Sequence, residues 1–262
     1  MPYANNRGVH IYYEVEGQGR PIIMAHGVTG YLGRWREIGL ADALKKDHRL
    51  ILFDARGHGK SDKPHDPAAY GIKMIGDVIA VLDACGLNKA TYWGYSMGAG
   101  VGLKAAVAHP ERFDSFILGG WSPYSASAGA PPTAPSTNAP QVGLLRTDPE
   151  AFLRSREQQL GRPLTPEERK AQLANDPEAL GALMVTFRDV ATLSDEDLEH
   201  IAVGCLLYAG DADPFHAGAK EAANHIPGAA FFSLPGLNHV QAGASPLVLP
   251  HVKEFLARVN RS

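Results

Sequence analysis

The pentapeptide Gly94-Tyr95-Ser96-Met97-Gly98 lies between a short apolar run and a segment rich in glycine and alanine. Gly-x-Ser-x-Gly at such a junction is typical of a tight strand-to-helix turn, because the positions two before and two after the serine leave almost no room for a side chain. Such a turn would hold Ser96 in a strained backbone conformation with its hydroxyl exposed above the sheet. Glycine-rich loops also produce this pattern by chance, so the flanking segments must decide its meaning.

Those segments favour the strand–turn–helix interpretation. Residues 89–93 predict a short buried strand, and residues 97–109 predict a helix that ends before Pro110. Further apolar runs predict strands over residues 9–15, 21–25, 49–53, 115–119, 204–209 and 229–234. Helical patterns lie between or after these strands, over residues 32–46, 72–82, 216–225 and 248–259. The alternation predicts an α/β fold, with a mostly parallel sheet of about eight strands covered by helices on both faces.

The composition changes in the middle of the chain. Residues 122–141 are mostly Pro, Ala, Ser, Thr and Gly, which predicts a loop or linker. Helices are then expected to begin after four N-cap residues: Asp148, Thr165, Asp176 and Ser194. These short helices predict a small helical lid over residues 121–203, inserted into a core of residues 1–120 and 204–262.

Charge and composition exclude several classes of partner. The 262 residues carry a formal net charge of -3 with both signs scattered, so nucleic acid is not an expected partner. No apolar stretch approaches the roughly 18 residues that a membrane helix requires, which predicts a cytoplasmic protein with no membrane partner. Cys85 and Cys205 lie in apolar runs without metal-ligand spacing, so we expect buried thiols, no metal and no cofactor. Nothing in the sequence indicates an oligomeric state.

A serine, a carboxylate and a histidine each follow a predicted strand, in the chain order Ser, Asp, His. This constellation resembles the α/β-hydrolase family. The resemblance covers nearly the whole chain and includes His26-Gly27, Asp54-x-Arg56-Gly57-x-Gly59-x-Ser61, Gly94 to Gly98, Gly210-x-x-Asp213 and His239. It implies the α/β-hydrolase fold and serine chemistry.

The resemblance also implies a role for each residue. Ser96 would be the nucleophile and His239 the base that accepts its proton, while Asp213 would orient the imidazole. The neighbouring Asp211 is the alternative acid. The backbone N–H groups of Val28 and Met97 would form the oxyanion hole.

Four aromatic side chains near strand ends could line an acyl pocket or belong to the core: Tyr95, Trp121, Tyr124 and Phe215. The expected function is cofactor-free hydrolysis of a small-molecule ester or lactone through an acyl-enzyme on Ser96. Alternatives on the same triad are carbon-carbon bond hydrolysis, acyl transfer and perhydrolysis. Relatives that cleave carbon-carbon bonds commonly have Asn before the serine, where this chain has Tyr95. A ligand receptor on a hydrolase scaffold is a further alternative.

Overall fold

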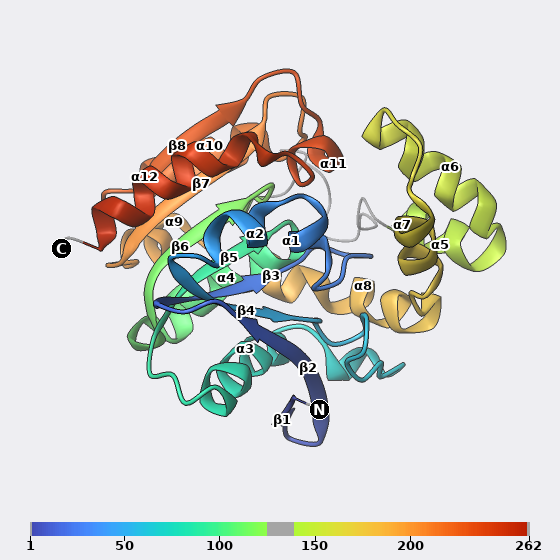
Figure 1. The fold of residues 1–262 in the computed structure, drawn as a ribbon, viewed down its shortest axis with the longest axis horizontal. Coiled ribbons are helices and arrows are strands. Elements are labelled where there is room, and N and C mark those ends of the chain that lie inside the picture. The colour runs from blue at the N-terminus through green and yellow to red at the C-terminus, as the bar shows by residue number, and fades with distance from the viewer. Residues whose placement is uncertain (1, 125–138, 261–262) are drawn as a thin grey trace.

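An eight-stranded sheet crosses the centre of the molecule (Figure 1). The computed structural model describes residues 2–124 and 139–260, including their side chains except those at positions 139 and 188–191. The strand order is β1-β2-β4-β3-β5-β6-β7-β8, and only the β1–β2 and β2–β4 pairs are antiparallel. The strands are β1 (Tyr3–Asn6), β2 (Val9–Glu16), β3 (Arg20–Ala25), β4 (His48–Phe53), β5 (Ala90–Tyr95), β6 (Phe113–Gly119), β7 (Gly204–Gly210) and β8 (Ala230–Leu234). The predicted fold class is confirmed.

Helices cover both faces of the sheet and bury two separate groups of apolar side chains. One face carries α1 (Arg34–Glu37), α2 (Leu40–Leu44) and α12 (Leu249–Val259). The opposite face carries α3 (Lys73–Ala84), α4 (Met97–Ala108) and α10 (His216–His225). Strands between these layers, such as β5, are buried along their whole length, which explains why they appear in the sequence as continuous apolar runs.

Among the residues that the structure describes between β6 and β7, there are five helices: α5 (Ala139–Thr147), α6 (Pro149–Leu160), α7 (Pro166–Leu173), α8 (Pro177–Ala191) and α9 (Asp195–Glu199). Figure 1 shows α5, α6 and α7 to one side of the sheet. The four predicted N-caps at Asp148, Thr165, Asp176 and Ser194 are confirmed, since each side chain accepts a backbone N–H of its helix. The boundaries of the lid at residues 121 and 203 stay a prediction.

The remaining elements are short. They are α11 (His239–Ala242) and the 3-10 turns η1 (Pro67–Ala69), η2 (Pro110–Arg112) and η3 (Pro246–Val248).

Three details differ from the sequence-based expectations. The single helix predicted over residues 32–46 is wrong: Gly39 has a φ of 76° and separates α1 from α2. Strand β1 was not predicted, although Arg7 and Gly8, both with positive φ, form a two-residue turn that pairs it with β2. Of the loop predicted over residues 122–141, positions 125–138 lie outside the described residues and 139–141 belong to α5.

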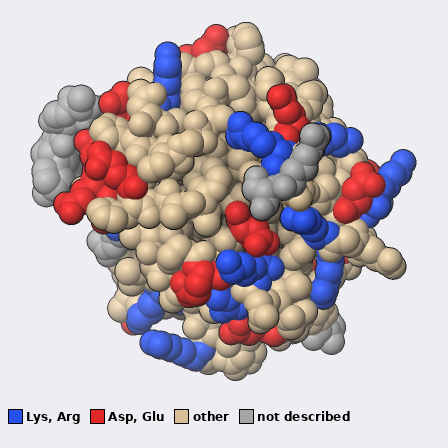
Figure 2. Space-filling view, turned by 90° about the vertical axis from the view of Figure 1, so that its left-hand side faces the viewer, with Lys and Arg blue, Asp and Glu red and all other residues tan. Residues whose placement is uncertain are grey.

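On the face drawn in Figure 2, basic and acidic side chains are interspersed over the centre and right, and several acidic side chains gather at the left edge. No helix in the described part of the chain is long and apolar enough to cross a membrane.

A buried ion pair joins three segments on the α3 face of the sheet. Arg56, which follows β4, donates through Nε to Asp77 Oδ2 of α3 at 2.6 Å and also contacts Oδ1. Asn6 Nδ2 of β1 donates to Asp77 Oδ1 at 2.7 Å. The side chains of Arg56 and Asp77 are only 3% and 2% exposed, so each charge depends on the other for compensation.

Replacing Asp77 by Ala should lower the free energy of unfolding by about 3–5 kcal/mol, because it leaves the buried Arg56 guanidinium without a counter-charge. Urea unfolding followed by circular dichroism would measure the change. The matched control is Asp83→Ala on the same helix, whose carboxylate is 63% exposed beside Arg112 and should contribute less than about 1 kcal/mol. Equal losses in the two variants would contradict the expectation.

Candidate active site

Ser96 lies in a strained turn between β5 and α4. Its φ is 53° and its ψ is -116°, a conformation that a residue with a side chain rarely adopts. A Cβ atom at Gly94 would lie 2.4 Å from the carbonyl carbon of Gly98, and one at Gly98 would lie 2.3 Å from the carbonyl oxygen of Ala25. The two glycines therefore let the chain turn sharply enough to present Ser96 at the end of the strand.

Two further sheet segments bring a histidine and a carboxylate to this serine. Ser96 Oγ lies 3.0 Å from His239 Nε2, and His239 Nδ1 lies 2.8 Å from Asp213 Oδ2. His239 is the first residue of α11, and Asp213 follows β7. Because a carboxylate accepts from Nδ1–H, Nε2 is left to accept the proton of the serine hydroxyl. The Asp213 side chain is fully buried, whereas that of His239 is 24% exposed.

The two neighbouring aspartates have different contacts. Asp213 Oδ1 accepts the backbone N–H of Phe215 at 2.9 Å, which leaves Oδ2 directed at the imidazole. Asp211 instead accepts the N–H of Gly236 at 2.7 Å and joins the loops that follow β7 and β8. Asp211 therefore occupies a turn position, and its carboxylate binds Gly236 and not His239.

The four aromatic residues named from the sequence take different positions. Tyr95 lines the pocket at Ser96, and its hydroxyl donates to the carbonyl oxygen of His239 at 2.5 Å. The ring centroids of Phe215 and His239 are 5.4 Å apart, and Trp121 stacks on the Phe215 ring with a centroid distance of 5.3 Å. Tyr124 donates to Asp195 at the start of α9. Of the four, only Tyr95 belongs to the described lining of the pocket.

The loop after β3 lies directly against the serine. A Cβ atom at Gly27 would lie 3.1 Å from Ser96 Cβ, and Val28 lines the same pocket. Met97 is the first residue of α4, where the N–H has no acceptor one turn earlier in the helix. The backbone groups of Val28 and Met97 thus belong to the two segments that border the Ser96 hydroxyl.

Two buried histidines brace this loop. His26 accepts the N–H of Ala55 through Nε2 at 3.1 Å, and His58 accepts the N–H of Thr29 through Nε2 at 3.3 Å. Nε2 therefore carries no proton in either ring, and both imidazoles are neutral. Burial, with the neighbouring His26, lowers the pKa of His58 to about 3, and burial lowers the pKa of His26 as well.

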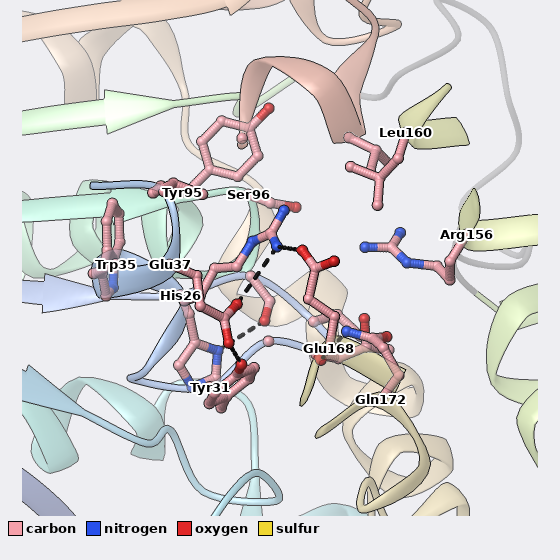
Figure 3. Close-up of a pocket in the computed structure, with 18 of the residues that line it drawn as sticks. His26, Tyr31, Trp35, Glu37, Tyr95, Ser96, Arg156, Leu160, Glu168 and Gln172 are labelled. Atoms are coloured by element: carbon pink, nitrogen blue, oxygen red, sulfur yellow. Dashed lines mark hydrogen bonds and ion pairs between the residues drawn. The ribbon is translucent and has the colours of Figure 1, made fainter. Parts of the chain in front are cut away.

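The pocket over Ser96 has a polar end that we did not predict from the sequence. Its volume is about 100 Å³, and four charged side chains line it: Arg34, Glu37, Arg156 and Glu168. Figure 3 shows Arg156, Glu168 and Gln172 converging on the space that Ser96 faces. These three residues come from α6 and α7, where the sequence shows only helix starts and charged surface positions. No spacing signal distinguishes them from solvated residues, because their direction depends on how the helices pack.

Glu168 is the centre of this polar end. It accepts from Arg34 Nη1 of α1 and from both Nη atoms of Arg162, each at 2.8 Å. Hydrogen bonds from Arg162, the Thr165 N–H and Arg34 lower the pKa of its carboxyl to about 2 in spite of burial. This charged cluster ties α7 to α1 across the pocket.

A hydroxyl can act as a nucleophile at neutral pH when it is hydrogen-bonded to an imidazole that is itself hydrogen-bonded to a buried carboxylate, because the imidazole takes the proton of the hydroxyl. Among the described residues, no group of three or more His, Cys, Asp or Glu side chains could hold a metal ion.

Several known proteins with similar sequences or structures are named as hydrolases, and others are named as a synthase, a decarboxylase or a bromoperoxidase. The chain is 37% identical over 123 residues to a putative carbamate hydrolase, RutD, of Azorhizobium caulinodans, a match that covers 47% of this chain and 45% of that protein. The chain thus matches only about half the length of its curated relatives. Two solved structures superpose over nearly all of it: an enol-lactonase from Burkholderia xenovorans LB400 (TM-score 0.78, 24% identity, 98% of this chain and 100% of that chain) and a thermophilic esterase from Thermogutta terrifontis (0.82, 22%, 98% and 98%).

A family model described as the alpha/beta hydrolase fold matches residues 20–166, which is more than half of the 262 residues. The matched region includes the loop after β3, the turn at Ser96 and strands β3 to β6. This match confirms the resemblance that the motifs predicted, and the chain belongs to the alpha/beta hydrolase family.

Proposed function

We propose that the protein is a serine hydrolase that cleaves carboxylic esters or lactones of small molecules through an acyl-enzyme on Ser96. The observation that carries the proposal is the continuous set of hydrogen bonds from Ser96 Oγ through His239 to Asp213, at 3.0 and 2.8 Å. Its distances are those of a nucleophile, a base and an orienting group in contact.

In the proposed reaction, Ser96 Oγ attacks the carbonyl carbon while its proton passes to His239 Nε2. The resulting imidazolium is stabilised by the buried Asp213 carboxylate. His239 then gives the proton to the departing alkoxide, which leaves as an alcohol. Water, deprotonated by the same imidazole, attacks the acyl-enzyme and releases the carboxylic acid and free Ser96.

The oxyanion formed in each half-reaction needs donors close to Ser96. We assign this role to the N–H groups of Val28 and Met97, because both segments border the serine and the second lies at the positive end of α4. The small pocket favours short acyl groups. The names of the similar proteins, a carbamate hydrolase, an enol-lactonase and an esterase, support attack at an acyl carbon.

Alanine at position 96 should reduce hydrolysis of p-nitrophenyl butyrate by at least about 10³-fold, because the nucleophile is removed. Intact-protein mass after treatment with a fluorophosphonate should show one adduct on the wild type and none on Ser96→Ala. Ser233→Ala, at an exposed position on β8, is the control and should keep both properties. Unchanged turnover by pure Ser96→Ala would refute the proposed function.

The two aspartates after β7 provide a matched pair. Asp213→Asn should lower kcat by about 10²- to 10⁴-fold, because an amide cannot hold the imidazole in the required tautomer as a carboxylate does. Asp211→Asn keeps an acceptor for the Gly236 N–H and should stay within about threefold of the wild type. Steady-state kinetics with the same ester would measure both. The reverse ranking would transfer the orienting role to Asp211.

His58, which braces the loop that carries Val28, should make folding sensitive to acid. The folded-state pKa of His58 is about 3 and its ordinary value is 6.5, so below pH 6.5 the unfolded chain binds a proton that the folded chain does not. Its stabilisation is complete above pH 6.5 and falls as the pH falls toward 3, by about 2 kcal/mol between pH 7.5 and pH 5. Urea unfolding at these two pH values should show a smaller loss for His58→Asn than for the wild type. Equal losses in the wild type and in His58→Asn would count against this role of His58.

A further inference from the structure

Arg156 is the one charged side chain of the pocket lining for which the structure records no opposite charge. It belongs to α6 and extends into the pocket that contains Ser96 (Figure 3). Its recorded hydrogen bond is from Nη1 to the neutral amide oxygen of Gln159 at 3.1 Å. Its Nε is shielded from solvent and has no hydrogen-bond partner in the described part of the chain. Among the described residues, no carboxylate lies within 4.0 Å of the guanidinium.

Several other partly or fully buried arginines of the described chain are paired with carboxylates, although the partly buried Arg49 instead donates to the carbonyl oxygen of Cys85. Arg34 contacts both Glu37 and Glu168, Arg56 is paired with Asp77, and Arg112 binds Asp83. This regularity follows from the free energy needed to remove a guanidinium from water, which a carboxylate partner offsets. Arg156 differs from Arg49 in that it lines the pocket at Ser96, where a ligand could supply the counter-charge.

The charges around the pocket point the same way. Glu168 is shared by Arg34 and Arg162, and Glu37 contacts Arg34. The four charged side chains that line the pocket are two guanidinium groups and two carboxylates, and both carboxylates contact Arg34 and not Arg156. Burial and the nearby Arg34 lower the pKa of Arg156 to about 10, so the group stays cationic at neutral pH.

A second polar atom of the pocket also lacks a partner. Gln172 is 9% exposed, and its Nε2 donates to the carbonyl oxygen of Thr29 at 3.2 Å. That bond fixes the orientation of the amide, and Oε1 is left buried with no donor from any residue that the structure describes. The unpaired donor of Arg156 suits an acceptor group of a ligand, whereas Gln172 Oε1 would need a separate donor, such as a hydroxyl or a water molecule beside that group.

We infer that Arg156 binds a free carboxylate of the substrate, so that the enzyme acts on esters or lactones that carry a second, ionised carboxyl group a few atoms from the bond that is cleaved. The inference rests on the proposed function, since it takes Ser96 as the reacting group. A planar guanidinium suits this task because two parallel N–H groups can bind both oxygens of a carboxylate. Arg156 would then be a specificity-determining residue that takes no part in bond cleavage.

Two esters of nearly equal size test the inference: mono-p-nitrophenyl glutarate, which carries a free carboxylate, and the p-nitrophenyl ester of glutaric acid monoamide, which carries a neutral amide there. The wild type should prefer the carboxylate. Arg156→Gln should lower kcat/KM for the carboxylate ester by about 10- to 100-fold, mainly through KM, and leave the amide ester within about twofold. Arg156→Lys should recover part of the loss.

The matched control is Arg154→Gln, an exposed position on the same helix, which should change neither substrate. Retained hydrolysis of the amide ester shows that Arg156→Gln is folded. Equal loss for both esters, or no preference in the wild type, would overturn the inference while leaving Ser96 chemistry intact.

A binding measurement separates this inference from the proposed function. Calorimetric titration of the Ser96→Ala variant with monomethyl glutarate should show binding, and the double variant with Arg156→Gln should bind at least about tenfold more weakly. Dimethyl glutarate should not distinguish the two proteins. If neither ester is hydrolysed, this titration still supports or refutes the carboxylate site: binding that needs Arg156 supports it, and binding that ignores Arg156 refutes it.

Discussion

Direct contact between the backbones at Gly94 and Gly98 determines where Ser96 stands. With no Cβ atoms at these positions, β5 can reverse into α4 within three residues, and the serine takes a positive φ that the surrounding packing enforces. Everything else in the site is placed relative to that hydroxyl. The loop after β3 touches it from one side, and the imidazole of His239 reaches it from the other. The absence of side chains at these two glycines therefore determines the position of the Ser96 hydroxyl.

The three groups that meet here come from segments far apart in the chain, and the sheet is what unites them. Parallel strands end at the same edge, so residues that follow β5, β7 and β8 converge although as many as 143 positions separate them. The buried Asp213 carboxylate is held by a backbone N–H on one oxygen and by the imidazole on the other. Its two acceptors are thereby used in fixed directions, which keeps the ring of His239 from rotating.

The residues at the sheet edge could be predicted from the sequence, whereas the pocket residues on α6 and α7 could not. Ser96, Asp213 and His239 each follow an apolar run that only a buried strand explains, so their shared edge follows from topology. Arg156 and Gln172 lie on polar helices whose direction depends on packing against the core, and periodicity carries no information about it. The break at Gly39 illustrates a smaller failure of the same kind: a glycine inside a helical pattern is compatible with either continuation or a turn, and tertiary contacts decide between them.

Thr29 links α7, which lines the pocket, to the loop after β3. Its carbonyl oxygen accepts the amides of Gln172 and Asn175, which belong to α7 and the residues just after it, while its N–H is bound by the buried His58. The same peptide segment carries Val28. These hydrogen bonds hold α7, the Thr29 peptide and His58 together beside the serine. The wall of the pocket that carries Gln172 and the loop that carries Val28 therefore form one hydrogen-bonded unit, so the position of one depends on that of the other.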